Sequence, residues 1–335
     1  MLTDRRQKLL QFIVDEYVSS AQPVGSGTIV QKYELPLSSA TVRNEMARLE
    51  EDGFIVQPHT SAGRVPTDRG YRYYVETLMP EEEPPEALRQ TIRHQFHQAA
   101  RELEEWARLA AAVLAAQLRN AAVVTPPHSH QPRLRWLELV SVHEYIALLV
   151  VVLQEARVLQ QTLALDAPTS QEELAAAAHR LNDLFAGLTA AQVRRRRAEL
   201  STLEASVTNA ALGLLDTVHG PGFESPFLEG LRDLLRQPEF SQGDRLELLD
   251  LLDERNVGRA IPLDPARAVT IIIGGEHPLD AMRACSVVTA RYSGPSGLLG
   301  SLSVVGPTRM DYPRAVSLVR YMSSLMDELL KAYFG

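Results

Sequence analysis

Residues 36–49 form the stretch that most constrains what this chain can fold into. Ser38 or Ser39 can cap the start of a helix, because a serine oxygen accepts hydrogen bonds from the free backbone N–H groups of a first turn. Val42, Met46 and Leu49 then recur at helical spacing and predict a buried face. The opposite side carries small and polar residues, as a helix that enters the major groove of DNA would. Taken alone, the stretch is more typical of an ordinary amphipathic surface helix.

The segments before this stretch favour a DNA-recognition helix. Residues 4–18 have an apolar stripe at helical spacing, which predicts a first helix with Thr3 as its cap. Ser26 can cap a short second helix, and residues 34–37 form a turn into the third. Gly53 can end the third helix in the left-handed conformation. This order of helix, short helix, turn and capped helix predicts a helix-turn-helix.

Residues 54–66 have the pattern of a β-hairpin directly after the third helix. Residues 54–57 and 63–66 are the two expected strands, and residues 58–62 are the loop between them. A hairpin in this position is a wing. Its Arg64 is placed to lie along the DNA backbone or to enter a narrow minor groove, where the negative potential is strongest. A further helix after Thr67 is expected to close the small core and lead away from the DNA.

Several motifs in this region resemble those of a known family. The matching residues are 5–9, 23–26, 38–46, 49–53, 60–72 and, near the other end of the chain, 305–312. Residues 2–79 closely resemble the winged-helix domain of the heat-inducible transcription repressor HrcA family. Together, the helix, the wing and the resemblance indicate that the DNA-binding residues are Ser38, Ser39, Thr41, Arg43, Asn44, Arg48, Ser61, Arg64 and Arg69.

The charge of the chain restricts how it can bind DNA. The net charge is −8, which argues against a surface coated for nonspecific nucleic-acid binding. Residues 1–79 hold nine basic and ten acidic side chains, a net charge of −1. DNA affinity then depends on placement, with the arginines gathered on one face and the carboxylates elsewhere, and on a dimer. The arginines expected on that face are Arg43, Arg48, Arg64, Arg69 and Arg72.

The rest of the chain alternates between helical and strand patterns. Residues 80–86 are an acidic, proline-rich linker. It is expected to hold the first domain off the rest of the chain, which we call the body. Residues 87–120 predict one long helix, whose apolar face packs either on the chain's own body or on a second subunit. Strands are expected at 134–142, 145–153, 157–165, 268–273, 285–292 and 298–305, and helices at 171–188, 190–215, 226–235, 244–254 and 312–334. The first three strands should form an antiparallel meander. One sheet interrupted by a helical insertion explains this order best.

No pattern in the sequence predicts a catalytic, metal or cofactor site. His128 and His130 lie in an expected loop without a visible third ligand. Cys285 is the only cysteine and stands in an apolar run, which favours a buried small residue over a redox role. The Gly274 turn lacks the following Gly-Lys-Ser/Thr of a phosphate loop. Arg194 to Arg197 read as a solvated face, or alternatively as a phosphate-contacting patch.

We therefore expect an α+β, multidomain protein that is not an enzyme, needs no cofactor and works in the cytoplasm, since no segment is apolar enough for a leader or a membrane span. The resemblance implies a GAF-like α/β domain interrupted by a mainly helical inserted dimerisation segment. The expected division is 1–79 winged helix, 80–86 linker, 87–190 and 257–335 GAF-like domain, and 191–256 insertion. The resemblance also implies a homodimer on the inverted-repeat operator CIRCE upstream of chaperone operons, relief of repression by heat, and the chaperonin GroEL as a partner. A metabolite-responsive repressor with a ligand in the GAF-like domain is the alternative.

Overall fold

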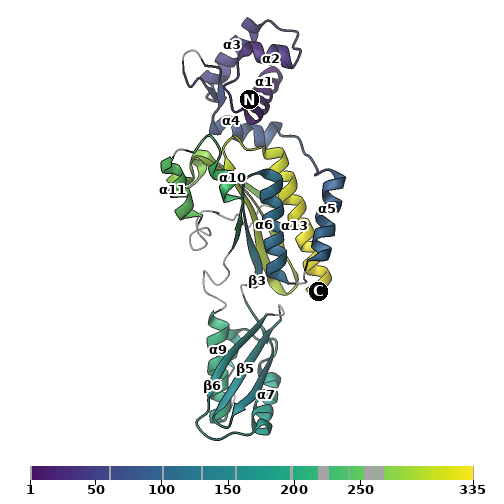
Figure 1. Ribbon diagram of the computed structural model, residues 1–335, viewed down its shortest axis with the longest axis vertical. Helices are drawn as coiled ribbons and strands as arrows, with labels where there is room; N and C mark the ends of the chain where they lie inside the picture. The colour runs from purple at the N-terminus through teal and green to yellow at the C-terminus, as the bar shows by residue number, and fades with distance from the viewer. Residues whose placement is uncertain are drawn as a thin grey trace. The chain divides into compact units, whose positions relative to one another are not determined.

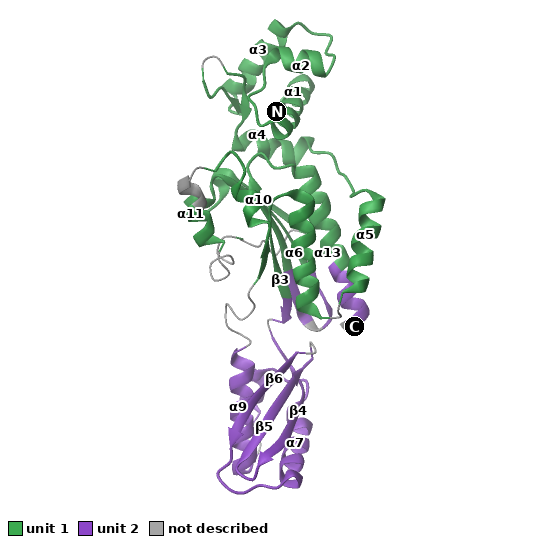
Figure 2. Cartoon of the chain, in the orientation of Figure 1, with its two compact units in different colours: residues 1–126, 226–291, 301–325 green, residues 127–225, 292–300, 326–335 purple. Residues whose placement is uncertain are grey.

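The computed structural model describes residues 2–59, 62–99, 102–129, 131–154, 157–196, 199–217, 226–240, 242–252, 261 and 268–334 (Figure 1). The fold is α+β, as expected. The chain forms two compact units (Figure 2). The first unit comprises residues 1–126, 226–291 and 301–325, and the second comprises residues 127–225, 292–300 and 326–335. None of the helices in the described ranges combines the length and apolar character needed to cross a bilayer.

The N-terminal part of the first unit consists of three helices, a hairpin and a further helical segment. The helices are α1 (Asp4–Ser20), α2 (Ser26–Lys32) and α3 (Ser39–Glu51). The hairpin pairs β1 (Ile55–Val56) antiparallel with β2 (Val65–Pro66). It is followed by α4 (Asp68–Tyr73) and a π-helical turn, η1 (Tyr74–Leu78). The expected order of elements is confirmed, and Gly53 has the predicted left-handed backbone with φ +77°.

A five-stranded sheet forms the centre of the described part of the body. Its order is β7-β3-β10-β9-β8, made by β7 (Phe227–Glu229), β3 (Ala121–Ser129), β10 (Leu298–Pro307), β9 (Cys285–Ser293) and β8 (Val269–Ile273). The helices beside it are α5 (Glu86–Gln98), α6 (Leu103–Leu118), α10 (Leu231–Leu235), α11 (Gln242–Leu251) and α13 (Tyr312–Phe334) (Figure 1). Almost every residue of β9 and β10 is buried, so both faces of these strands are covered.

The second unit contains a separate three-stranded antiparallel sheet, in the order β4-β5-β6 (Figure 2). Its strands are β4 (Leu134–His143), β5 (Ile146–Leu153) and β6 (Val158–Ala164), which confirms the predicted meander. Its helices are α7 (Gln171–Phe185), α8 (Ala190–Arg195) and α9 (Thr202–Thr217). Leucines and valines from one face of the sheet pack with apolar residues of these helices into one core.

The expectation of one sheet with a helical insertion was wrong. The strands at 134–164 pair only among themselves within the described chain, and the later strands join β3 and β7 instead. The compact second unit begins at residue 127, so the structure divides the chain differently from the expected insertion at 191–256. Alternation of apolar residues predicts that a segment is a strand, but it carries no information on which strand is its neighbour.

Two expected long helices are each replaced by two shorter ones. Residues 87–120 form α5 and α6, because Ala99 and Glu102 have extended backbones. Ile92, Phe96, Ala107, Ala110 and Leu114 are buried within the chain itself, which supports packing on its own body. Residues 190–215 form α8 and α9. Ser201 and Glu204 make the reciprocal hydrogen bonds of a capping box before α9, a start signal that the sequence analysis overlooked.

Two further segments differ from the expectation. Residues 226–235 form β7 and α10 rather than one helix. The expected loop around His128 is the end of β3. β7 pairs with β3 only over residues 122–124 of β3. Pro126 and Pro127 lie beyond this stretch, so they need not donate a backbone hydrogen bond to β7. His130, Arg197 and Ser61 lie outside the described residues.

Candidate nucleic-acid interface

The inner face of α3 is fixed by packing and by hydrogen bonds to α1 and α2. Val42, Met46 and Leu49 are almost completely buried, as predicted. Arg6 of α1 donates to Glu45 over 2.9 Å. The hydroxyls of Ser26 and Ser39 lie 2.9 Å apart and join α2 to α3. The helix is therefore a rigid part of this three-helix assembly.

Ser38, and not Ser39, caps α3. Its side chain accepts a hydrogen bond from the backbone N–H of Thr41 at 3.1 Å, and the two hydroxyls lie 2.9 Å apart. Ser39 is committed to the contact with Ser26. Ser26 itself is the first residue of α2, whose cap position is occupied by Gly25 instead of the expected serine. Ser38 and Thr41 remain at the start of the helix, where a phosphate could approach the N-terminal backbone.

The outer face of α3 presents two polar side chains without partners. Arg43 and Asn44 are both exposed, and neither makes a hydrogen bond or ion pair with the residues that the structure describes. Arg48, one turn later, pairs with Glu51 at 2.7 Å, and this hydrogen bond raises the pKa of the guanidinium. Arg43 and Asn44 are thus the residues of α3 whose donors and acceptors are fully available to base edges.

Arg64 is held at the base of the hairpin. Its guanidinium forms an ion pair with Glu50 at 3.0 Å, and its side chain is only 16% exposed. Glu50 also accepts from the backbone N–H of Gln57 at 3.0 Å. The backbone of Arg64 exchanges two hydrogen bonds with Val24, of 2.8 and 2.9 Å. This placement favours a structural role for Arg64 over the expected DNA contact, because its side chain is mostly buried and its Nε and one terminal nitrogen already contact Glu50.

We expect Arg64→Ala to lower the free energy of unfolding by about 1–3 kcal/mol, because it leaves the Glu50 carboxylate without its guanidinium. Urea titration measures this change. The slope of log affinity for DNA against log salt should stay unchanged, whereas loss of one phosphate contact would reduce it by about 0.9. Arg43→Ala is the matched control for stability, since Arg43 has no partner among the described residues. A reduced slope with an unchanged free energy of unfolding would instead support a direct contact of Arg64 with DNA.

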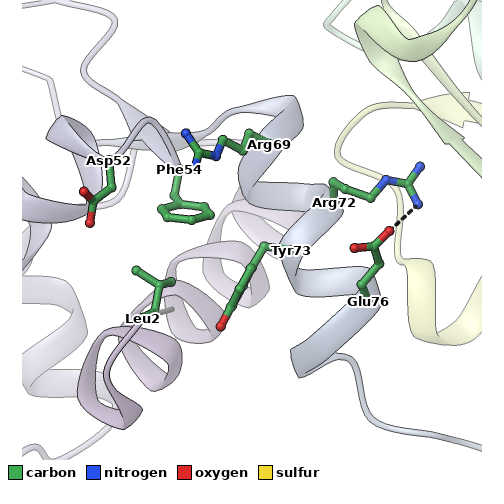
Figure 3. Close-up of a pocket in the computed structure, with 7 residues that line it drawn as sticks. All are labelled: Leu2, Asp52, Phe54, Arg69, Arg72, Tyr73 and Glu76. Carbon is green, nitrogen blue, oxygen red and sulfur yellow. Dashed lines mark ion pairs between the residues drawn. The ribbon is translucent and has the colours of Figure 1, made fainter.

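The arginines of α4 point in different directions, and both line a pocket beside β1 (Figure 3). The guanidinium of Arg69 lies over the ring of Phe54, 4.7 Å from its centroid. Arg72 pairs with Glu76 at 3.7 Å and also with Glu276 of the body. Arg72 is therefore bound within the chain.

The expected separation of arginines and carboxylates was wrong. Among the five arginines expected on one DNA-facing surface, Arg48, Arg64 and Arg72 each form an ion pair with a carboxylate. Arg43 and Arg69 are exposed and form no ion pair with the part of the chain that the structure describes. The basic character of the candidate interface is therefore concentrated on fewer side chains than the sequence suggested.

A buried polar contact joins α1 to η1 behind the three-helix core. Tyr74 donates to Asp15 at 3.0 Å. Burial raises the pKa of Asp15, while the hydrogen bond from Tyr74 acts in the opposite direction. Burial likewise raises the pKa of Tyr74 far above its usual value. Tyr74 is neutral at physiological pH, so its uncharged hydroxyl donates the hydrogen bond to the carboxylate of Asp15.

Comparison with known proteins covers the whole chain. The family model described as "HrcA protein C terminal domain" matches residues 104–316. The Heat-inducible transcription repressor HrcA of Roseiflexus castenholzii is 45% identical, with 100% of this chain and 96% of the relative aligned. The protein of the same name from Dehalococcoides mccartyi (strain ATCC BAA-2266) is 39% identical over 100% of this chain and 98% of its own length. A crystal structure titled only as a hypothetical protein at 2.2 Å resolution has a TM-score of 0.68 and 25% identity, covering 99% of both chains.

These relatives define the class of protein as transcription repressors, which implies that the chain binds DNA. The chain belongs to the HrcA family of heat-inducible transcription repressors. The resemblance expected from the sequence motifs is thereby confirmed.

Proposed function

We propose that this protein is a homodimeric repressor that reads an inverted-repeat operator with α3, in a winged helix-turn-helix. The observation that supports this most is the contrast between the two faces of α3. Val42, Met46 and Leu49 are buried, while Arg43 and Asn44 are exposed and have no hydrogen-bond or ion-pair partner among the described residues. Arginine and asparagine offer bidentate hydrogen bonds to guanine and adenine edges. A two-fold dimer presents two such helices, so the operator must have the same symmetry.

The finer parts of the proposal follow from membership of the family. The operator is of the CIRCE type and lies upstream of chaperone operons. Heat inactivates the repressor, and the chaperonin GroEL helps it to reach its active form. The five-stranded sheet and its helices correspond in this proposal to a GAF-like domain, and the protein acts in the cytoplasm.

Selection of bound sequences from random DNA tests the operator proposal. We expect enrichment of an inverted repeat whose two halves are read identically. The same selection with Arg43→Ala should lose the preference at one position of each half-site. Recovery of single, asymmetric sites, or of no enriched sequence, would contradict the proposal.

The uncovered face of the β4-β5-β6 sheet is the surface that we assign to dimerisation. Trp136, Val142 and Val158 are 47%, 65% and 59% exposed, although each is a large apolar side chain. The strand register aligns Trp136 with Val152 and Val152 with Val158, so three apolar residues cross the outer face in one row. Contiguous apolar patches of this kind mark protein interfaces.

A second copy of this chain is the partner proposed for this face. The helices α7 and α9 pack on the other face of the same sheet. Trp136, Val142 and Val158 on the outer face therefore stay exposed among the described residues of this unit. An isologous contact between two identical faces buries the apolar side chains of both copies. It also creates the two-fold axis that an inverted repeat requires.

Trp136→Asp is expected to raise the dissociation constant of the dimer by about 30-fold or more, since a buried interfacial tryptophan contributes about 2 kcal/mol or more. Sedimentation equilibrium measures this change. Ala176→Asp is the matched control, because it adds the same charge to an exposed position of α7 on the helical side and should leave the dimer intact. Equal dissociation constants for the two variants would exclude this face as the interface.

A further inference from the structure

α4 makes a polar contact with the body of the first unit that the sequence analysis did not anticipate. Arg72 donates through Nε to Glu276 at 2.8 Å, and through a terminal nitrogen to the backbone carbonyl of Ile271 at 2.8 Å. The backbone N–H of Gly275 donates to Asp68 at 2.8 Å. The linker at 80–86 was expected to hold the N-terminal domain off the body, and this expectation was wrong.

The receiving loop is shaped for Asp68. The 3-10 turn η2 (Gly274–Glu276) begins at Gly274, whose φ is +49°. A Cβ at Gly274 would lie 2.4 Å from a carboxylate oxygen of Asp68. Only glycine therefore allows the carboxylate to approach the backbone this closely. The sequence Gly274-Gly275-Glu276 predicted only a turn. In the structure, the backbone of the two glycines receives Asp68, and Glu276 forms the ion pair with Arg72.

A second contact lies at the other end of the same junction. The rings of Tyr71 and Tyr312 are 5.7 Å apart between centroids. Arg309 forms an ion pair with Glu239 and donates to Gln237 at 2.9 Å and to the carbonyl of Val18 at 3.4 Å. The Gly-Pro-Thr-Arg-Met-Asp-Tyr motif thus reaches the end of α1, and the N-terminal domain is held at two places.

The orientation of α4 determines that of α3. Thr67, the cap of α4, donates to the carbonyl of Gly53 directly after α3 at 2.7 Å. Gly70 lies so close to Phe54 that an added Cβ would be 2.1 Å from the Phe54 carbonyl oxygen. With α4 locked to the end of α3 in this way, a contact that fixes α4 on the body also fixes the direction of α3.

We propose that Asp68 and Arg72 are positioning residues that hold α3 at one angle to the body, so that the dimer accepts one spacing between operator half-sites. This inference rests on the proposed function. Two DNA-binding domains that hang on flexible linkers reach half-sites at many spacings, whereas two domains fixed to their bodies reach a narrower range of spacings.

The test uses the full-length protein and a series of inverted repeats, in which the spacer between half-sites changes in single base pairs through one helical turn. We expect the unmodified protein to prefer one spacing by about tenfold or more over a half-turn offset. Asp68→Ala with Arg72→Ala should reduce this preference to about threefold or less. Asp4→Ala with Lys8→Ala is the matched control. It removes an exposed acid and an exposed base, also four residues apart, from the N-terminal part of α1 and should keep the preference.

A charge exchange separates the contact with Glu276 from a direct contact of Arg72 with DNA. Arg72→Glu alone should abolish the spacing preference, and Arg72→Glu combined with Glu276→Arg should restore it. If Arg72 bound phosphate, the second substitution could not restore binding. A full spacing preference in the Asp68→Ala, Arg72→Ala protein would overturn the inference.

A readout without DNA distinguishes failure of this inference from failure of the proposed function. Spin labels are attached at Ala40→Cys on α3 and at Arg314→Cys on α13, both exposed positions, while native Cys285 is buried and only 1% exposed. We expect a narrow distance distribution, broadened by Asp68→Ala with Arg72→Ala but not by the Asp4→Ala, Lys8→Ala control. Identical distributions would overturn the inference. A broadened distribution in a protein that ignores inverted repeats would contradict only the proposed function.

Discussion

Replacing Arg43 with alanine should weaken binding of the inverted-repeat operator by about 1–3 kcal/mol, or 5- to 150-fold. Arg43 is exposed on the outer face of α3 and has no partner among the described residues, so its guanidinium is available to a base edge. Asn44→Ala should have an effect of the same size for the same reason. Gel-shift titration measures both affinities, and sedimentation should show that the dimer is unchanged.

A control for Arg43 must remove a positive charge without touching the interface. Lys331→Ala serves this purpose, because Lys331 is an exposed residue of α13 in the part of the chain that belongs to the other compact unit. It should change affinity by no more than the loss of one distant charge, which salt screens. If Arg43→Ala and Asn44→Ala both bind the operator as the unmodified protein does, α3 is not the reading element.

Replacing Gly70 with alanine is expected to cause the largest loss of stability. Gly70 is buried in α4, and a Cβ there would lie 2.1 Å from the carbonyl oxygen of Phe54. The added Cβ is fixed to the backbone of α4 and the atom that it meets belongs to the backbone of Phe54. No side-chain rotation can therefore relieve the clash. We expect a loss of more than about 4 kcal/mol, in the range of severe single substitutions, together with loss of DNA binding.

Gly27→Ala is the matched control for Gly70→Ala. Gly27 is exposed in α2, and nothing lies within 4 Å of a Cβ added there. Alanine is the better helix former by about 1 kcal/mol, so this variant should be as stable as the unmodified protein or slightly more stable. Urea titration followed by circular dichroism compares the two. Equal midpoints would mean that Gly70 of α4 does not lie against the Phe54 backbone in solution.

The sequence was most informative where structure depends on near neighbours. The buried face of α3 at Val42, Met46 and Leu49 could be read from helical spacing, and the end of α3 from Gly53. The meander of β4, β5 and β6 could be read from alternation and short connections. The break between α5 and α6 could not, because residues 99–102 contain neither glycine nor proline and the apolar spacing continues on both sides.

For the candidate interface, the sequence supplied the residue types but not their partners. Arg43, Arg64 and Arg72 are the same residue type in the sequence. In the described structure Arg43 has no ion-pair partner, Arg64 pairs with Glu50 and Arg72 pairs with Glu276. Glu50 lies 14 residues from Arg64, and Glu276 lies 204 residues from Arg72. No periodicity links positions so far apart.

What the sequence determined by itself was therefore the family, the local elements and the buried face of α3, since these follow from short motifs and from spacing along the chain. The tertiary structure alone decided which strands share a sheet, which arginines pair with carboxylates among the described residues, and how α4 contacts the Gly274 turn. Those outcomes depend on contacts between segments that are distant in the sequence. Such a contact stabilises the protein only when folding brings both partners out of water and within hydrogen-bonding distance.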